Sequence, residues 1–122
     1  METESLKRYN EVTGENYTSD SVLAEALQKD IIPVYRRFLE LLRSIDPQTE
    51  DVKNLHKIYI DGAEYTYRGL EEILGGVKLK DIDMIRAGNK KIEKGRVENE
   101  KWREKLIMLY NKYDIPSKPF QP

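Results

Sequence analysis

Apolar residues in the second half of the chain recur at alternating steps of three and four, which places them on one face of an α-helix. They predict two long helices, from Thr49 to Leu74 and from Asp81 to Asn111. Gly75 and Gly76 favour the left-handed backbone that ends a helix, so we expect them to close the first one and to begin a short turn. The two helices then form an antiparallel hairpin.

A third apolar stripe runs from Asp20 to Ile45, again at steps of three and four. Pro33 lies inside it and lacks the N–H that would bond the Lys29 carbonyl. Either the helix kinks between Lys29 and Ile32, or the chain breaks there. Because the stripe continues in phase past the proline, one kinked helix is the preferred interpretation. Its inner positions are Leu23, Leu27, Ile31, Val34, Phe38, Leu41 or Leu42, and Ile45.

The remaining segments complete an all-α antiparallel bundle of three long helices and a short N-terminal helix. Residues 5–16 carry the short helix, which Gly14 ends. Asp46, followed by Pro47, is the expected cap of the next helix, and Thr49 is the second candidate. The last helix is expected to end at 114–116, so residues 1–115 form one domain. Three prolines make residues 116–122 an extended tail.

Glycines recur at a regular spacing along the hairpin, although each lowers helix stability by about 1 kcal/mol relative to alanine. Gly62 and Gly69 are seven residues apart, as are Gly88 and Gly95. A turn centred between residues 76 and 81 sets Gly62 opposite Gly95 and Gly69 opposite Gly88. The pairs would either bring the backbones close or leave room for side chains of the third helix, for which Tyr35 and Phe38 are the candidates. Alternatively, some of these glycines face solvent.

Composition places the chain among charge-rich helical proteins. Of its 122 residues 39% are hydrophobic and 35% charged, with a net charge of −1, which gives no basic surplus for nucleic acid. Residues 1–77 hold 9 basic and 15 acidic side chains, whereas residues 78–122 hold 12 basic and 7 acidic ones. Either the acidic part of the chain packs beside the basic last helix, or the charges of both lie on solvated faces. No apolar run reaches the roughly 20 residues of a membrane span.

No motif carries a recognisable reaction. The chain has no cysteine and a single histidine, His56, with no second ligand at helical spacing. A half-buried, hydrogen-bonded histidine is the preferred interpretation, and an enzyme would need His56 beside a carboxylate in an open cleft. The acidic pairs lie at helix ends, and the segment around Gly75 lacks the arc of a phosphate-binding loop. We therefore expect no catalytic residue, no metal and no cofactor.

The register brings an aromatic and polar zone together at one end of the hairpin. It sets Leu55 opposite Trp102 and places Tyr59, His56 and Asn99 nearby. Tyrosine and tryptophan combine a large apolar body with a polar atom that needs a partner. These four side chains, His56, Tyr59, Asn99 and Trp102, either line a ligand pocket or are ordinary packing with their polar tips at the surface.

The order of the packing motifs resembles the small helical lipoproteins of Gram-positive bacteria over residues 30–113. The motifs are Ile31-Ile32-Pro33, Ile45-Asp46-Pro47, Glu50-Asp51-Val52-Lys53, Leu55-His56, Tyr59-Ile60, Gly62-Ala63 and Asn89 to Gly95. The resemblance implies an extracytoplasmic bundle, with a signal and lipid anchor in the precursor, and supplies no active site. We therefore expect a non-catalytic module that binds a protein or a small molecule through the Tyr59/Trp102 end or the tail. A cytoplasmic adaptor is the alternative.

Overall fold

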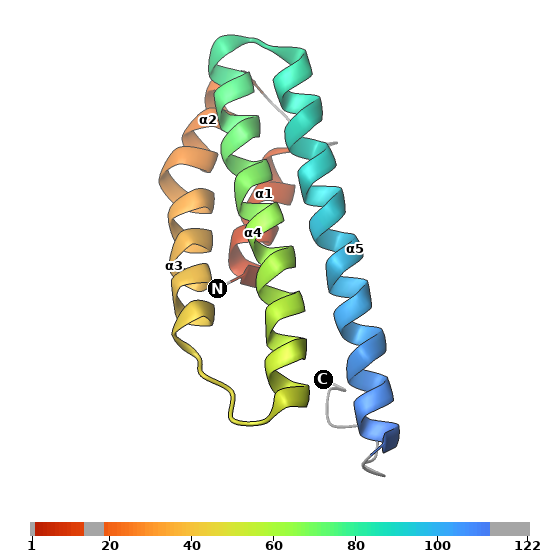
Figure 1. Ribbon diagram of the computed structural model, residues 1–122. Coiled ribbons are helices and arrows are strands. Elements are labelled where there is room, and N and C mark those ends of the chain that lie inside the picture. The colour runs from red at the N-terminus through yellow and green to blue at the C-terminus, as the bar shows by residue number, and fades with distance from the viewer. Residues whose placement is uncertain (1, 14–18, 113–122) are drawn as a thin grey trace.

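The computed structural model describes residues 2–13 and 19–112 and confirms the all-α class. All regular secondary structure in these residues is helical (Figure 1). The end of the last helix at 114–116, the domain boundary at 115 and the tail 116–122 lie outside the described residues. The elements are α1 (Glu2–Val12), α2 (Asp20–Ala26), the π-helical turn η2 (Leu27–Ile31), α3 (Ile32–Ser44), α4 (Glu50–Leu79) and α5 (Ile82–Lys112).

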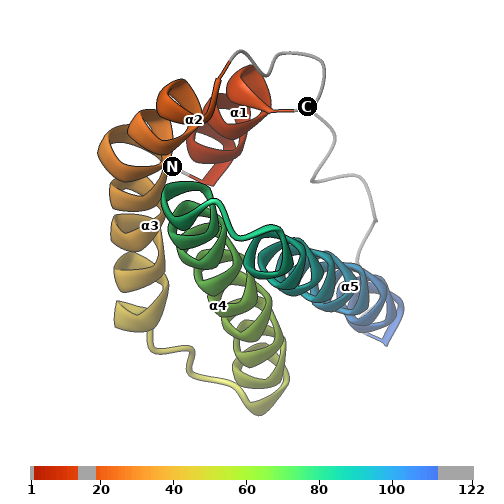
Figure 2. The ribbon, with the colours of Figure 1, turned by 90° about the horizontal axis from the view of Figure 1, so that it is seen from above.

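Helix α4 is the centre of the bundle (Figures 1 and 2). Seen from above, it separates α5 from the layer formed by α2 and α3, and α1 lies beside that layer. The apolar core therefore lies between α4 and the first half of the chain, where Leu27, Ile31, Tyr35, Leu70 and Ile73 are almost completely buried. Among the described helices, only α4 has its backbone alongside α5.

The α4–α5 interface is built on the glycines. A Cβ atom on Gly62 would lie 3.1 Å from the Gly95 carbonyl oxygen, and one on Gly69 would lie 2.6 Å from that of Gly88. These are the pairs that the register predicts, and the backbones approach closely. Of the two alternatives, close approach of the backbones is therefore the one found, and Tyr35 and Phe38 are not among the nearest neighbours of these positions.

Gly75 and Gly76 do not end α4, contrary to the prediction. The helix continues to Leu79, and Lys80 takes the left-handed conformation, with φ 54° and ψ 40°. Gly76 serves close approach instead, because a Cβ there would lie 2.7 Å from Ile85 Cγ1 and 2.9 Å from its backbone nitrogen. Asp81 then caps α5, as expected, by accepting from the Met84 N–H at 3.2 Å.

Thr49, the second candidate, caps α4 in place of Asp46. Its hydroxyl accepts from the Val52 N–H at 3.3 Å, and its backbone is extended, as a capping residue requires. Pro47 lies in the non-helical connection before it. Glu50 and Asp51 in the first turn complement the positive end of the helix dipole, which favours a start at this point.

The helix containing Pro33 is continuous, and η2 absorbs the proline. The chain stays helical from Asp20 to Ser44, with wide hydrogen-bonded turns directly before Ile32 and Pro33. In a regular α-helix, steps of four overshoot one turn, but a π-helical turn takes up the excess. A stripe at steps of four therefore stays on one face, and it consists of Leu23, Leu27, Ile31, Tyr35 and Leu39.

The phase predicted beyond Pro33 was consequently wrong in part, although Phe38 and Leu42 do pack against the core. Val34 and Phe38 are only half-buried, and Leu41 and Ile45 are 52% and 55% exposed. Ile32, Tyr35 and Leu39 take the core positions instead.

Helix α1 is held by polar contacts that cross the bundle. Glu2 accepts hydrogen bonds from the hydroxyls of Tyr35 at 2.7 Å and Tyr59 at 2.6 Å. The Ser5 hydroxyl donates to the Ile31 carbonyl oxygen at 2.7 Å. These bonds fix α1 over the upper part of α3 and α4. The short first helix is therefore present, although it begins at Glu2 and ends at Val12.

Ion pairs join the acidic side of α4 to the basic α5. Lys91 Nζ lies 2.5 Å from Glu72 Oε2, and Lys112 Nζ lies 3.3 Å from Asp51 Oδ2. Both pairs are at least partly exposed, so each contributes well under about 1 kcal/mol. Some of the acidic residues of the first part of the chain therefore pair with basic residues of α5.

A candidate binding groove

An apolar groove lies where α3, the first half of α4 and the second half of α5 meet. We call it the open-end groove, because it lies at the end of the hairpin opposite Lys80. It has a volume of about 440 Å³, and the described residues that line it include no aspartate, glutamate, lysine or arginine. The lining residues are Leu42, Val52, Leu55, His56, Tyr59, Trp102, Leu106 and Leu109.

Helix lengths explain why this groove is open. The apolar stripes of α4 and α5 continue to the end of the hairpin, whereas α3 ends at Ser44 and α1 begins at Glu2, beside Tyr59. The upper part of the same face is covered by α1. Among the described residues, no helix covers the lower part.

Tyr59 and Trp102 form the boundary between these two parts. Their rings meet edge to face with centroids 5.1 Å apart, and Phe38 packs against the other side of Tyr59 at 6.3 Å. Burial raises the pKa of the Tyr59 phenol, and the hydrogen bond to Glu2 raises it further. Tyr59 is therefore held as a neutral donor that anchors α1 and lines the groove.

His56 has a structural partner inside the groove. Its Nε2 atom lies 2.7 Å from the Leu42 carbonyl oxygen, and since a carbonyl can only accept, this nitrogen carries the proton. The bond fastens the end of α3 to α4. No carboxylate is among the described residues that line the groove, so His56 has no acidic partner there.

Asn99 lies outside the open-end groove. It lines a second hollow of about 260 Å³ between α1, α4 and α5, to which Glu2, Thr66 and Arg96 also contribute. Tyr59 borders both hollows. The structure therefore brings His56, Tyr59 and Trp102 together and sets Asn99 on the other side of Tyr59, under α1.

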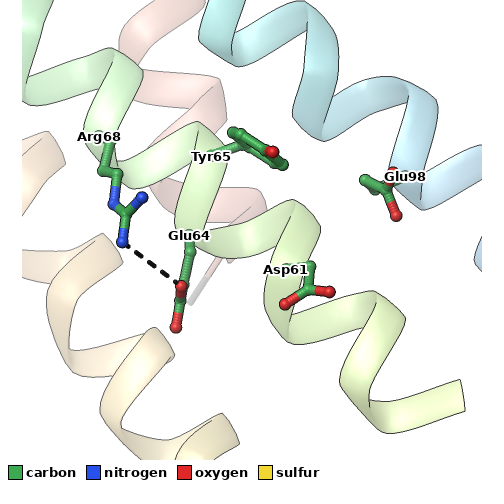
Figure 3. A pocket seen from close by; sticks show the side chains of 5 residues that line it. All are labelled: Asp61, Glu64, Tyr65, Arg68 and Glu98. Carbon is green, nitrogen blue, oxygen red and sulfur yellow. Dashed lines mark ion pairs between the residues drawn. The ribbon is translucent and has the colours of Figure 1, made fainter. Parts of the chain in front are cut away.

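A third hollow, which the sequence analysis did not single out, is acidic (Figure 3). Its residues are Asp61, Glu64, Tyr65, Arg68 and Glu98. Arg43 and Arg68 contact the Glu64 carboxylate at 2.8 and 3.8 Å. Lys101 pairs with Glu98 at 3.1 Å. In the part of the chain that the structure describes, no cluster of three or more possible ligands could hold a metal ion. This hollow is a network of surface ion pairs.

Comparison of the chain with protein-family models, with curated proteins and with solved structures finds no match. Within the described residues, no helix combines the length and the apolarity that crossing a bilayer requires.

The aromatic part of the groove was predicted from the sequence, and its aliphatic part was not. Val52, Leu106 and Leu109 lie on the apolar stripes that predict α4 and α5, where they are indistinguishable from core positions, and Leu42 was one of two alternatives for a core position. The lengths of the helices could have revealed the groove. The apolar stripes of α4 and α5 are longer than the helices that are available to cover them.

Proposed function

We propose that the chain is a non-catalytic binding module whose open-end groove accepts an apolar segment of a protein or a small apolar ligand. The observation that carries this proposal is the groove itself, with a volume of about 440 Å³ and a mainly apolar lining in the part of the chain that the structure describes. Ligand sites are typically apolar hollows of about 300–1,000 Å³ with a few polar groups.

The exposed surroundings of the groove support binding by an extended apolar partner. Val52 is 43% exposed in the lining, and Ile45 and Ile107 nearby in the sequence are 55% and 46% exposed. Apolar side chains left exposed beside a hollow can mark a site of interaction. The Tyr59 hydroxyl and the Nε2–H of His56 are already bonded within the protein, so recognition relies mainly on shape and apolar contact.

A binding role fits this site better than a catalytic one. The Nε2–H of His56 is engaged by the Leu42 carbonyl, so only Nδ1 could act as a base, and no described residue of the groove lining offers it a nucleophile to activate. An enzyme that uses covalent catalysis would require a nucleophile and a base within hydrogen-bonding reach of each other. The groove lining provides neither a carboxylate nor a serine, threonine or cysteine among the described residues.

A ligand screen on the full chain tests the proposal. A panel of apolar and proline-rich peptides is added while the thermal midpoint is followed, since a ligand of the folded state raises it. Leu106→Lys places a charge in the groove and should abolish each response. Met108→Lys, on the same helix, alters a residue that is 68% exposed and outside the groove lining, and should retain them. Responses that survive Leu106→Lys would contradict the proposal.

We further propose that the protein acts outside the cytoplasm, anchored through a lipid on its precursor. The support is the resemblance of residues 30–113 to small helical lipoproteins. Fractionation of cells that express the complete reading frame, with metabolic labelling by a fatty acid, tests this. Label in the membrane fraction is expected, and an unlabelled protein in the cytosol would favour the adaptor alternative.

A further inference from the structure

We infer that the outer face of α5 is a docking surface for the anionic headgroups of a lipid bilayer. Six basic side chains of α5 follow one another at steps of four or seven residues, so they share one face of the helix. We call this face the basic stripe, and it consists of Arg86, Lys90, Lys94, Lys101, Lys105 and Lys112. The inference goes beyond ligand binding in the open-end groove and does not depend on it.

The basic stripe lies on the uncovered side of α5. Lys101 follows Ile92 by nine residues, which at about 100° per residue places it half a turn around the helix. Ile92 packs against the core and lines the hollow under α1, so the stripe points away from α1. Helix α5 lies at the edge of the bundle, with only α4 alongside it among the described helices (Figure 2). All six side chains of the stripe are exposed.

Half of the positive charges of the stripe are unpaired within the described part of the chain. Lys90, Lys94 and Lys105 form no ion pair there, although the ammonium group of Lys94 lies 5.9 Å from the centre of a tyrosine ring. The other three cations have carboxylate neighbours at 3.9, 3.1 and 3.3 Å, in the pairs Arg86–Asp83, Lys101–Glu98 and Lys112–Asp51. Exposed pairs of this kind are weak, so an external anion can replace them at little cost.

The acidic side chains of α4 beside the stripe do not cancel its charge. Arg43 and Arg68 contact the Glu64 carboxylate, and Lys91 contacts that of Glu72. Asp61 lies near Glu98 at the border of the stripe and has no such cation among the described residues. One negative charge then stands beside six positive ones. The outer face of α5 is therefore locally positive, although the net charge of the chain is −1.

Exposed apolar side chains within the stripe favour a bilayer over other polyanions. Val97 and Met108 lie between the lysines and are 40% and 68% exposed. At the interface of a bilayer, basic groups reach the phosphates while their methylene stems and neighbouring apolar side chains enter the layer below. A nucleic acid or an acidic peptide would satisfy the charges and leave Val97 and Met108 against a polar surface. From Arg86 to Lys112 the stripe extends for about 40 Å, long enough to contact several headgroups.

A hollow at the lower end of the stripe combines the same two properties. It has a volume of about 360 Å³, and its lining residues are Asp51, Asn54, Leu55, Lys105, Met108, Leu109 and Lys112. Lys105 and Lys112 offer cations to a phosphate. Leu55, Met108 and Leu109 offer apolar contact to the beginning of an acyl chain. This pairing of cations with apolar surface is what the headgroup region of an anionic phospholipid requires.

Sedimentation with lipid vesicles tests the inference on the full chain. Vesicles of phosphatidylcholine and phosphatidylglycerol in equal parts should bind the wild type at low ionic strength, whereas phosphatidylcholine alone should not. The stripe variant combines Lys90→Gln, Lys94→Gln and Lys105→Gln. Each basic residue at an anionic surface strengthens binding roughly fivefold, so the three together should weaken it about 100-fold.

The matched control combines Lys7→Gln, Lys29→Gln and Arg103→Gln, all at exposed positions outside the stripe. It changes the net charge by the same three units and should bind the anionic vesicles nearly as the wild type does. Equal weakening in the two variants would mean that only net charge matters and would overturn the inference. Absence of wild-type binding to the anionic vesicles would overturn it as well.

A single fluorescent label reports which face touches the bilayer. The chain has no cysteine, so Met108→Cys provides one site for an environment-sensitive dye. Its emission should shift to shorter wavelength on anionic vesicles. The control is Asn99→Cys, nine residues earlier and therefore half a turn around α5, where the emission should not change. Equal shifts at both positions, or no shift at residue 108 in the bound protein, would overturn the assigned face.

Polyanions in place of vesicles test the choice of partner. If duplex DNA or polyglutamate binds through the stripe lysines while anionic vesicles do not, the partner is an acidic macromolecule and the bilayer assignment is wrong. Leu106→Lys, which alters the open-end groove, should retain vesicle binding, because Leu106 lies outside the stripe. Failure of the proposed function and failure of this inference are therefore distinguishable.

Discussion

Gly69 and Gly88 lie against each other across the α4–α5 hairpin with no room for a side chain on either. A Cβ on Gly69 would stand 2.6 Å from the Gly88 carbonyl oxygen, and one on Gly88 would stand 2.7 Å from that of Gly69. Backbone atoms cannot turn aside as a side chain does. The close approach of the two helices therefore depends on both residues.

Gly69→Ala should destabilise the protein by about 1–3 kcal/mol, because the helices must move apart to admit the methyl group. This outweighs the gain of about 1 kcal/mol in helix propensity. Urea denaturation followed by circular dichroism measures the change. The matched control is Gly75→Ala, whose Cβ would meet only the flexible end of Met84, and which should be neutral or stabilising. Equal losses in both variants would refute a special role for the Gly69–Gly88 contact.

Glu2→Ala should loosen α1, because one carboxylate bonds both Tyr35 and Tyr59. Loss of hydrogen bonds to a charged group costs about 1.5–3 kcal/mol each at most, and solvent that enters reduces the cost. Limited proteolysis should cut α1 sooner, and the urea midpoint should fall. Glu4→Ala removes the same charge from an exposed position of the same turn and should change neither result.

Alkaline pH should unfold the protein through its buried tyrosines. Burial raises the pKa of Tyr35, with a further contribution from Glu2, and raises that of Tyr59 as well. The folded state therefore holds these protons longer than the unfolded state, whose phenols titrate near pH 10. The stabilisation is complete below about pH 10 and is lost as the pH rises further.

Tyr35→Phe tests this assignment. Phenylalanine cannot ionise, so the variant should be less stable than the wild type at neutral pH but should lose less stability above about pH 10. Urea midpoints across this range provide the comparison. Parallel losses in the two proteins would show that other groups cause the alkaline transition.

Deletion of Gln28 should be tolerated. This residue is exposed within the wide turn η2, and removing it leaves a regular α-helix whose flanking halves keep their buried faces. Deletion of the exposed Lys57 in the regular helix α4 instead rotates everything beyond it by about 100° relative to the core. Circular dichroism should show a cooperative thermal transition for the first deletion and its loss for the second. A folded Lys57 deletion beside an unfolded Gln28 deletion would contradict this account of η2.

The hairpin was predictable because its pattern is local. Steps of three and four give α4 and α5, and the sevenfold spacing of Gly62 and Gly69 gives their register. The end of α4 was not predictable in the same way. Gly76 is equally suited to a turn and to close contact, and only the position of Ile85 in space decides between them.

Other features depend on distant parts of the chain. The phase of α3 follows from η2, which has no sequence motif beyond Pro33 and the steps of four around it. The role of Glu2 depends on two tyrosines 33 and 57 residues away. Buried tyrosine hydroxyls need a partner, so Tyr35 and Tyr59 could have prompted a search for one. Asn99 was predicted to lie with His56, Tyr59 and Trp102, although it lines a different hollow, because the register alone does not show where α1 lies.

The attachment of α1 also has a consequence for the order of folding. The contacts of α4 with α5 next to the turn at Lys80 join residues close in sequence, so they close short loops and form quickly, and pairing can then extend along the hairpin. The Glu2–Tyr59 bond spans 57 residues and requires α3 and α4 to be packed already, because Tyr35 shares the same carboxylate. We therefore expect the hairpin to assemble first and α1 to dock last, which makes the N-terminal helix the slowest part to form and the first to detach.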